Sequence, residues 1–504
     1  MITNENTVAE TNNTLNESQF NETYAVDLKL KGAKGDGISD DSKYVSDELN
    51  KGYRIFNGGI YAVFDRTIIH SLKFTSGNAY LMYEGNKYPF GNIVNQHIEL
   101  NVPSVFYNIQ HCFEWLDGKR IIGDSSVTIK IADGVYQQSW VNTVNHVDGN
   151  NIYIRGNEAD RSKCIIEVDN LNNRDCFLIS NKCSLGWLNG ITIKGMKGWL
   201  SEGTWATQCY GSGIRAIDGS SIVCGTEIEI DKMYYGMRSM HGATISAIGK
   251  SADNIKGGGV RVTNAGDVGF HAHAATIYCN CAEASNVGHK TEGLGFGFCA
   301  EAGGYIVCEY ACATNNIKAG FYALSQGTVW AHGVNSSNNL YGVLAWGGTV
   351  ECNSLGKYQT ILNNNLIAGI RATYGGLVGA NSAKVISNTM GILADENGII
   401  DVTAVQSNDN AQHGFSAISG GYITGNSAVS ERNNINGFNA EDGGIIKSID
   451  SSANDNGSYG YFAKNHSKIF CKGFGGMRNT LFCSPLQNSI TELAGNNSSF
   501  IIDV

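Results

Sequence analysis

The sequence predicts an all-β protein, a right-handed parallel β-helix that follows a small N-terminal α/β head. The first observation is a glycine-led segment that recurs with spacings of 22, 23, 23 and 23 residues from Gly369 to Gly460. A fixed period in this range is typical of a solenoid whose repeats stack on their neighbours. The second observation is the pattern within the repeat, where an apolar residue, a variable residue and alanine follow the glycine. This period of two predicts a strand rather than a helix.

Each coil is expected to contain a strand, a glycine turn, a second short apolar strand and a loop, as in "GFSAISGGYITG". Strands of successive coils would pair in parallel, about 4.8 Å apart, with the right-handed crossover that parallel strands adopt. Two columns support the stacking. Cysteine recurs ten or eleven residues after the glycine, which suits a dry interior. Asparagine recurs nineteen residues after it, as a hydrogen-bonded ladder would require, at Asn316, Asn339, Asn388, Asn410, Asn433 and Asn456.

Composition narrows the possible functions. Of 504 residues, 63 are glycine, 3 are proline and 16% are charged, whereas about 25% is the average charged content. The net charge of −10 argues against nonspecific nucleic-acid binding. No signal peptide and no membrane-spanning run is visible, so we expect synthesis in the cytoplasm and no membrane insertion. The 14 cysteines include no C-x-x-C, so we expect buried thiols, no metal and no cofactor.

Four segments follow one another along the chain. Residues 1–24 are polar, and we expect a partner surface to hold them as an attachment segment. Residues 25–123 would form a head and neck of short helices and strands. In residues 35–41, three acids would form a turn and cap the next helix, with cation binding as the alternative. Residues 124–480 would form the β-helix, and residues 481–504 a cap for its open end.

The head carries a family resemblance. "GAKGDGISDD" before a short helix resembles the opening of pectate-lyase superfamily β-helices, especially bacteriophage tailspikes and tail fibres. "VTIKIADGVY" and "NIYIRGN" resemble the first coils of that superfamily, and as a fold pattern the resemblance covers most of residues 25–480. It implies a homotrimer in the virion tail that docks through its N-terminal segment on a tail, baseplate or adaptor protein.

The resemblance also implies that the protein binds host surface polysaccharide during adsorption. Two alternatives stay open, because a fold does not fix a function. The first is an active depolymerase, either a glycoside hydrolase or a lyase. The second is a purely structural tail component. The Asn-Thr-Asp, Arg-Ile-Lys and Asp-Pro-His strings of the superfamily's enzymes are absent, so no reaction transfers residue by residue.

A charged cluster is the first candidate site. The second residue after each repeat glycine should point outward, which places Arg215 and Arg238 on consecutive coils and Arg261 on a third if a coil begins just before it. Asp218 and His241 follow at the next turn. Stacked cations repel unless an anion lies on them, so the arginines could hold a sugar carboxylate while Asp218 or His241 moves a proton. The alternative is a lattice of ion pairs or a subunit contact.

Acidic and aromatic residues give two further candidates. Asp395 and Glu441 occupy one turn column two coils apart, roughly 9.6 Å from the strand spacing, near the separation of inverting glycosidase carboxylates. A solvated acidic turn is the alternative, and Glu301 in the same column is expected to stand alone. Trp346 and Tyr374 occupy neighbouring turns, where two exposed rings could stack on sugars or contact another subunit.

Overall fold

The structure, a computed structural model, describes residues 25–52, 54–70, 72, 75–201, 204–205, 208–247, 258–289, 294–472, 479, 481–486 and 490–494. The expected attachment segment, residues 1–24, lies outside the described residues. The chain divides into two compact units, Met1–Ile129 and Lys130–Val504, whereas the sequence placed the boundary between residues 123 and 124. No described helix is long and apolar enough to cross a membrane.

The first unit combines short helices with small sheets. Its described helices are η1 (Leu28–Lys31), α2 (Ser42–Leu49), α3 (Thr67–His70) and α4 (Ile109–Leu116). Its strands are β1 (Ala25–Val26), β2 (Asp36–Asp40), β3 (Arg54–Phe56), β4 (Ile60–Ala62), β5 (Thr75–Gly77), β6 (Tyr80–Tyr83), β7 (Asn86–Pro89), β8 (Ile93–Val94), β9 (Ile98–Val102), β10 (Arg120–Ile121) and β11 (Val127–Ile131). Strands β2, β4, β6 and β7 form one sheet, and β1, β3 and β5 form another.

Backbone N–H groups donate hydrogen bonds to the three acids of residues 35–41, where strand β2 forms in place of the expected turn. Asp41 accepts them from Lys34 and Gly35, at 2.8 and 3.0 Å, and although it occupies the N-cap position of α2 its side chain does not cap the helix. Asp40 accepts one from the N–H of Ser42, where α2 begins. Asp36 accepts two backbone hydrogen bonds, and these, that of Ser39 first, lower its pKa to about 2. The acids therefore stabilise the backbone around β2 and the start of α2.

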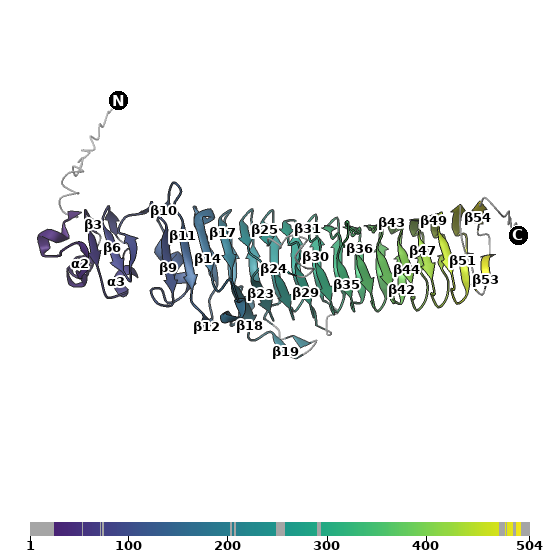
Figure 1. Cartoon of the computed structure of the whole chain (residues 1–504), viewed down its shortest axis with the longest axis horizontal. Coiled ribbons are helices and arrows are strands. Elements are labelled where there is room, and N and C mark those ends of the chain that lie inside the picture. Colours follow the sequence, from purple (N-terminus) through teal and green to yellow (C-terminus); the bar gives the residue numbers. More distant parts are fainter. Residues whose placement is uncertain are drawn as a thin grey trace, which may run out of the picture. The chain divides into compact units, whose positions relative to one another are not determined.

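The second unit is a right-handed parallel β-helix (Figure 1). Its strands belong to three long sheets, of 16, 14 and 13 strands. Within each sheet, a strand pairs in parallel with the corresponding strand of the next coil. Most coils therefore contribute three strands, and the sequence-based expectation of two strands is wrong. From β26 on, the third strand of each coil is only three residues long, such as β35 with the sequence "NSS" and a single buried residue. Such a segment has no apolar alternation that the sequence could reveal.

The 14-stranded sheet carries the first strand of each repeat. In order it contains β13 (Asn142–Val144), β16 (Phe177–Ile179), β21 (Ser212–Ala216), β24 (Tyr235–Met240), β27 (Val268–His273), β30 (Phe296–Glu301), β33 (Ala319–Leu324), β36 (Tyr341–Trp346), β39 (Ala368–Thr373), β42 (Met390–Ala394), β45 (Phe415–Ala417), β48 (Phe438–Glu441), β51 (Tyr459–Lys464) and β53 (Leu481–Leu486).

The other two sheets complete the coils. Within the second unit, the 16-stranded sheet contains β14 (Ile152–Arg155), β17 (Ser184–Asn189), β22 (Ser221–Cys224), β25 (Thr244–Ala247), β28 (Thr276–Tyr278), β31 (Tyr305–Val307), β34 (Thr328–Trp330), β37 (Thr349–Glu351), β40 (Leu377–Gly379), β43 (Ile399–Thr403), β46 (Tyr422–Asn426), β49 (Ile445–Ile449), β52 (Lys468–Lys472) and β54 (Ile490–Ala494). The 13-stranded sheet contains β12 (Gly134–Gln138), β15 (Cys164–Val168), β18 (Ile191–Gly195), β23 (Ile228–Asp231), β26 (Arg261–Thr263), β29 (Glu283–Ser285), β32 (Cys312–Thr314), β35 (Asn335–Ser337), β38 (Ile361–Asn363), β41 (Lys384–Ile386), β44 (Gln406–Asn408), β47 (Val429–Glu431) and β50 (Ser452–Asn454). Strands β19 (Trp199–Ser201) and β20 (Thr204–Trp205) form a separate antiparallel pair, and η3 (Gly149–Asn151), η4 (Arg161–Lys163) and η5 (Leu171–Asn173) are short 3-10 turns. Strands β53 and β54 pair with β51 and β52, so coil strands continue into the segment expected to be a cap.

The repeat pattern has a packing explanation. The repeat alanines, such as Ala300 and Ala323, lie in register and are fully buried. Beside them, the rings of Phe270, Phe298 and Phe321 stack with centroids 4.8 and 4.9 Å apart. The repeat glycines leave no room for a side chain, since a Cβ on Gly320 would lie 2.0 Å from the Ser336 hydroxyl oxygen. Side chains of the repeat strand therefore fill the interior.

Both predicted columns are confirmed. Each asparagine Oδ1 accepts a hydrogen bond from the backbone N–H of the asparagine one coil earlier, at 2.8–3.1 Å from Asn316 to Asn479. The ladder also contains Asn365, which the pattern missed because its coil is longer. The 13 cysteines whose side chains the structure describes are free thiols. The predicted column is buried at Cys224, Cys279, Cys308, Cys352 and Cys471.

Candidate functional site

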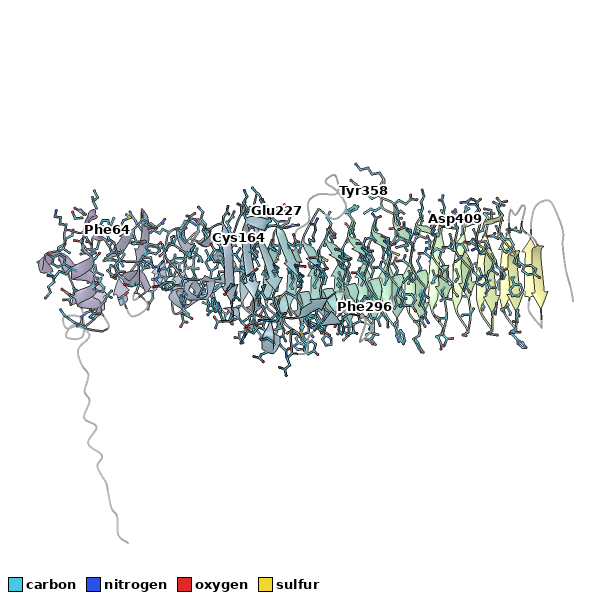
Figure 2. All side chains as sticks on the ribbon, turned by 90° about the horizontal axis from the view of Figure 1, so that it is seen from below. Phe64, Cys164, Glu227, Phe296, Tyr358 and Asp409 are labelled. Carbon is cyan, nitrogen blue, oxygen red and sulfur yellow. The ribbon has the colours of Figure 1, made fainter. Side chains whose placement is uncertain are left out.

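The outer face of the 14-stranded sheet positions most of the candidate residues. Figure 2 shows Phe296 of β30 on the side of the second unit opposite to Tyr358 and Asp409. On this face, Arg238 of β24, His271 of β27 and Cys299 of β30 occupy one register column. The next column on this face lies at the ends of the strands. Together with the turn that follows each strand, it forms what we call the sheet edge. The sheet edge contains Asp218, His241, His273, Glu301, Trp346 and Tyr374.

The structure brings the two predicted arginines together. Arg215 and Arg238 are register partners on β21 and β24. Each has a different contact, because an Arg215 Nη1 atom lies 3.5 Å from the Asp175 carboxylate and the Arg238 guanidinium lies 4.1 Å from the ring centroid of Tyr235. Burial raises the pKa of Asp175, which Arg215 opposes. The arginines thus have protein contacts that reduce their mutual repulsion.

Asp218 and His241 lie beside each other at the turn, as the sequence predicts. The His241 Nδ1 atom is 3.3 Å from Asp218 Oδ1, and both side chains are more than half exposed. Both residues have positive φ angles, of 55° and 52°. An exposed pair of this kind adds little to stability, and its polar atoms are available to a ligand.

Arg261 belongs to a different sheet, which corrects the expected arginine column. It lies on β26 of the 13-stranded sheet, between Glu229 and Glu283. Its Nε atom is 3.1 Å from a Glu283 carboxylate oxygen. The next residue in the Arg238 column is instead His271, 33 positions along the chain. The prediction assumed a spacing of 23 residues between coils. Because this coil is longer, Arg261 does not reach the register position that follows Arg238.

Glu301 was expected to stand alone, and the structure corrects this as well. Its Oε1 atom lies 2.9 Å from both His271 Nε2 and His273 Nδ1. The hydrogen bond from His271 is the first cause that lowers the pKa of Glu301 to about 2, and burial opposes it. Burial in turn lowers the pKa of His271. The carboxylate is therefore an anion between two imidazoles, beside the Cys299 thiol.

The sequence carried one signal for this cluster. His271 and His273 are two residues apart, so a strand presents them on the same face. Their partners on β30 lie 28 positions later, at Cys299 and Glu301. Because the regular period is 22 or 23 residues, no fixed spacing could place the two pairs side by side.

The predicted carboxylates, Asp395 and Glu441, have the expected register, but Asp395 is bound by an arginine of the same chain. Ala394, Ala417 and Ala440 lie in one column, so Asp395 and Glu441 are two coils apart, roughly 9.6 Å from strand spacing. Arg371 binds Asp395 through both oxygens, at 2.7 and 3.1 Å. Asp395 is 8% exposed. A carboxylate that an arginine binds through both oxygens has a structural role.

The aromatic pair lies at the sheet edge. The rings of Trp346 and Tyr374 stack with centroids 4.5 Å apart and planes inclined by 16°. They are 39% and 53% exposed. Two parallel rings form one broad apolar surface of the kind that binds sugar faces. Glu301 lies two coils away along the same edge, roughly 9.6 Å.

A separate hollow lies over the first coils of the 13-stranded sheet and was not predicted. Its volume is about 490 Å³. Both signs of charge line it, including Glu167, Asp169 and Lys197. Because it lies on another sheet, it does not extend the sheet edge.

Comparison with protein families and with curated proteins finds no match. Solved structures are similar to the chain. The catalytic domain of a GH87 α-1,3-glucanase, in complex with nigerose, matches with a TM-score of 0.41 and 9% identity, over 78% of this chain and 68% of that one. The A-module of a mannuronan C-5 epimerase from Azotobacter vinelandii matches with a TM-score of 0.29 and 12% identity, over 92% and 98%. The N-terminal fragment of bacteriophage Phi29 gene product 12 matches with a TM-score of 0.36 and 10% identity, over 91% and 71%. At this level of similarity, function has to be argued from the residues of this chain.

Proposed function

We propose that the protein is a bacteriophage tailspike or tail fibre that binds bacterial surface polysaccharide during adsorption. The observation that carries the proposal is the exposed, stacked pair of Trp346 and Tyr374. Large exposed aromatic rings are costly for a soluble surface unless they serve an interaction. The head sequence "GAKGDGISDD", which resembles that of tailspikes, supports the virion assignment.

The sheet edge offers a polysaccharide more than the two rings. Exposed hydrogen-bonding groups lie further along the same edge of the shaft, at His241 and Asp218. Consecutive strands are about 4.8 Å apart, so an extended sugar chain parallel to the shaft meets one new side chain on each coil. Arg238 lies beside this path and can pair with a sugar carboxylate. The arrangement suits a linear, acidic polysaccharide.

The chemistry of these residues favours binding over hydrolysis. Glu301 is engaged by His271 and His273, each 2.9 Å from its Oε1 atom. Asp395 is engaged by Arg371 through both oxygens. We therefore place depolymerase activity second, with His241 and Asp218 as the exposed groups able to move a proton.

We also propose that the protein is a homotrimer and docks on a tail or adaptor protein through residues 1–24. Partly buried apolar residues that surround a buried cluster on the outer face of the 14-stranded sheet support self-association. The cluster includes Tyr322, Leu344 and Leu393, with Phe296 and Met390 packed against it and only partly buried. Sedimentation equilibrium tests this proposal, since the mass of one chain in solution would contradict it.

An array of bacterial surface polysaccharides tests the main proposal. The purified protein should bind a small set of acidic glycans, and incubation with a bound glycan should release no new chain ends. New reducing ends would identify a hydrolase, and unsaturated ends that absorb ultraviolet light would identify a lyase. Binding to no polysaccharide on the array would favour the purely structural tail component.

A further inference from the structure

We propose that His271, His273, Cys299 and Glu301 form a zinc site on the outer face of the 14-stranded sheet. This site joins β27 to β30. The proposal does not depend on polysaccharide binding and goes beyond it. It rests on the strand register, the convergence of the ligand atoms and the chemistry of the four side chains.

The strand register sets the four residues in a square. His271 pairs with Cys299, and His273 pairs with Glu301. Within each strand the two residues are two positions apart, so all four side chains leave the same face of the sheet. The intervening residues, Ala272 and Ala300, are fully buried on the other face. The backbone thus presents two histidines opposite a cysteine and a glutamate.

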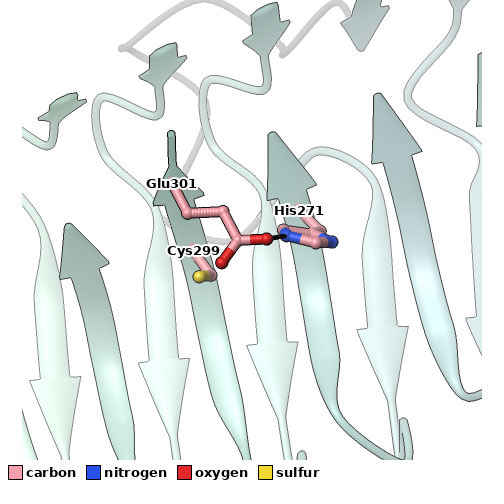
Figure 3. A group of neighbouring side chains, drawn as sticks. All are labelled: His271, Cys299 and Glu301. Atoms are coloured by element: carbon pink, nitrogen blue, oxygen red, sulfur yellow. Dashed lines mark hydrogen bonds and ion pairs between the residues drawn. The ribbon is translucent and has the colours of Figure 1, made fainter. Parts of the chain in front are cut away.

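The ligand atoms of His271, Cys299 and Glu301 already converge, and His273 Nδ1 joins this group through its contact with Glu301. The Glu301 Oε1 atom lies 2.9 Å from His271 Nε2 and 2.9 Å from His273 Nδ1. Donor atoms of His271, Cys299 and Glu301 lie within 4.8 Å of one another. Figure 3 shows the Glu301 carboxylate between the Cys299 sulfur and the His271 ring. Zinc lies about 2.0–2.3 Å from such atoms, so shifts of side chains alone would admit one ion.

The donor set matches zinc in type and charge. Histidine nitrogen, cysteine sulfur and carboxylate oxygen are its usual ligands, and four of them make a closed, structural site. The Cys299 thiol would lose its proton to solvent on binding. The Glu301 carboxylate and the Cys299 thiolate then balance the two charges of the ion. A neutral complex suits residues as buried as His271 and Cys299, which are 5% and 4% exposed.

The surroundings also favour a ligand. The other ring nitrogen of His271, Nδ1, is buried and has no hydrogen-bond partner within the described part of the chain. Nε2, which faces Glu301, is the atom that would bind the ion. Arg238 is the nearby cation, and it stacks on Tyr235. His273 is 35% exposed and Glu301 28%, which leaves an ion a path from solvent.

Zinc titration of the chelator-treated, full-length protein tests the proposal. We expect one tightly bound zinc ion per chain and a higher melting temperature with zinc than without. Glu301→Gln and His273→Asn should each weaken binding at least about tenfold. Cobalt, which zinc sites also accept, should give a thiolate-to-cobalt absorption band that Cys299→Ser removes.

Two substitutions elsewhere serve as controls. Cys308→Ser removes a buried thiol beside the 16-stranded sheet. His97→Ala removes an exposed histidine of the first unit. Both should keep the zinc stoichiometry and the cobalt band, and circular dichroism checks that every variant folds. The proposal is overturned if the wild type binds no zinc, or if binding survives in Glu301→Gln and Cys299→Ser as well as in the controls.

Discussion

At the scale of single residues, the partner of a polar side chain separates structural groups from candidate functional groups. Arg371 binds Asp395, and the Asn339 side chain belongs to the ladder. Asp218 and His241 form an exposed pair, and the His241 ring lies 6.0 Å from that of His273. Exposed groups of this kind contribute little to folding. We therefore expect their substitution to change the proposed polysaccharide binding without unfolding the protein.

A half-buried histidine gives the protein a specific acid sensitivity. Burial lowers the pKa of His413 from 6.5 to about 4. A histidine whose pKa is lower in the folded state stabilises the fold fully above about pH 6.5 and loses this contribution as the pH falls toward about 4. His413→Asn should therefore flatten the fall in unfolding free energy over this window, by up to about 3 kcal/mol.

Urea unfolding of wild type and variant at several pH values across this window checks the expectation. His466→Asn, at an exposed position, is the matched control and should leave the pH dependence unchanged. Curves for His413→Asn that run parallel to the wild type would show that His413 does not carry the effect.

At the scale of elements, the sequence predicts what depends on local spacing and misses what depends on coil length. The asparagine ladder and the inward alanines follow a period of 22 or 23 residues, and both are confirmed. Arg261 was misplaced and the partners of Glu301 were missed, because the β24–β27 and β27–β30 steps are 33 and 28 residues long. The third strand of the regular coils was missed because it is only three residues long, as in β35.

The repeat glycines should tolerate no side chain. In Gly320→Ala, the new Cβ would lie 2.0 Å from the Ser336 hydroxyl oxygen and 2.8 Å from the Gly342 carbonyl oxygen. We expect a loss of about 1–3 kcal/mol from this overpacking, measured as a lower urea midpoint. Gly425→Ala is the control, since its Cβ would meet neighbours only at 3.8 Å. Equal midpoints for the two variants would contradict the packing explanation.

At the scale of the whole second unit, the coils are joined mostly to their neighbours, as in other solenoids. The asparagine ladder runs from Asn316 to Asn479 and supplies one buried polar rung per coil. The sheet edge runs along the same shaft, from Asp218 to Tyr374. Stability and the proposed binding surface therefore extend in the same direction, and a local defect should affect neighbouring coils first.

Removing one rung tests this arrangement. Asn410→Ala leaves the buried N–H of Asn388 without its acceptor, which should cost about 1–3 kcal/mol. The control Asn465→Ala, on a later coil than Asn410, removes an exposed hydrogen bond to Asp442 and should cost much less. Hydrogen exchange should show the loss of protection concentrated near Asn388 and Asn410. Uniform loss over the unit would contradict a solenoid of locally coupled coils.

Calorimetric titration with the glycan selected on the array tests the central claim most directly. Three proteins are compared: the wild type, Trp346→Ala with Tyr374→Ala, and Trp330→Ala. Trp330 is equally exposed, at 40%, but lies on β34 of another sheet. We predict that the double variant binds at least about tenfold more weakly, a loss of about 1.4 kcal/mol, while Trp330→Ala binds as the wild type does. Unchanged binding by the double variant would contradict the claim that this sheet edge is the polysaccharide site.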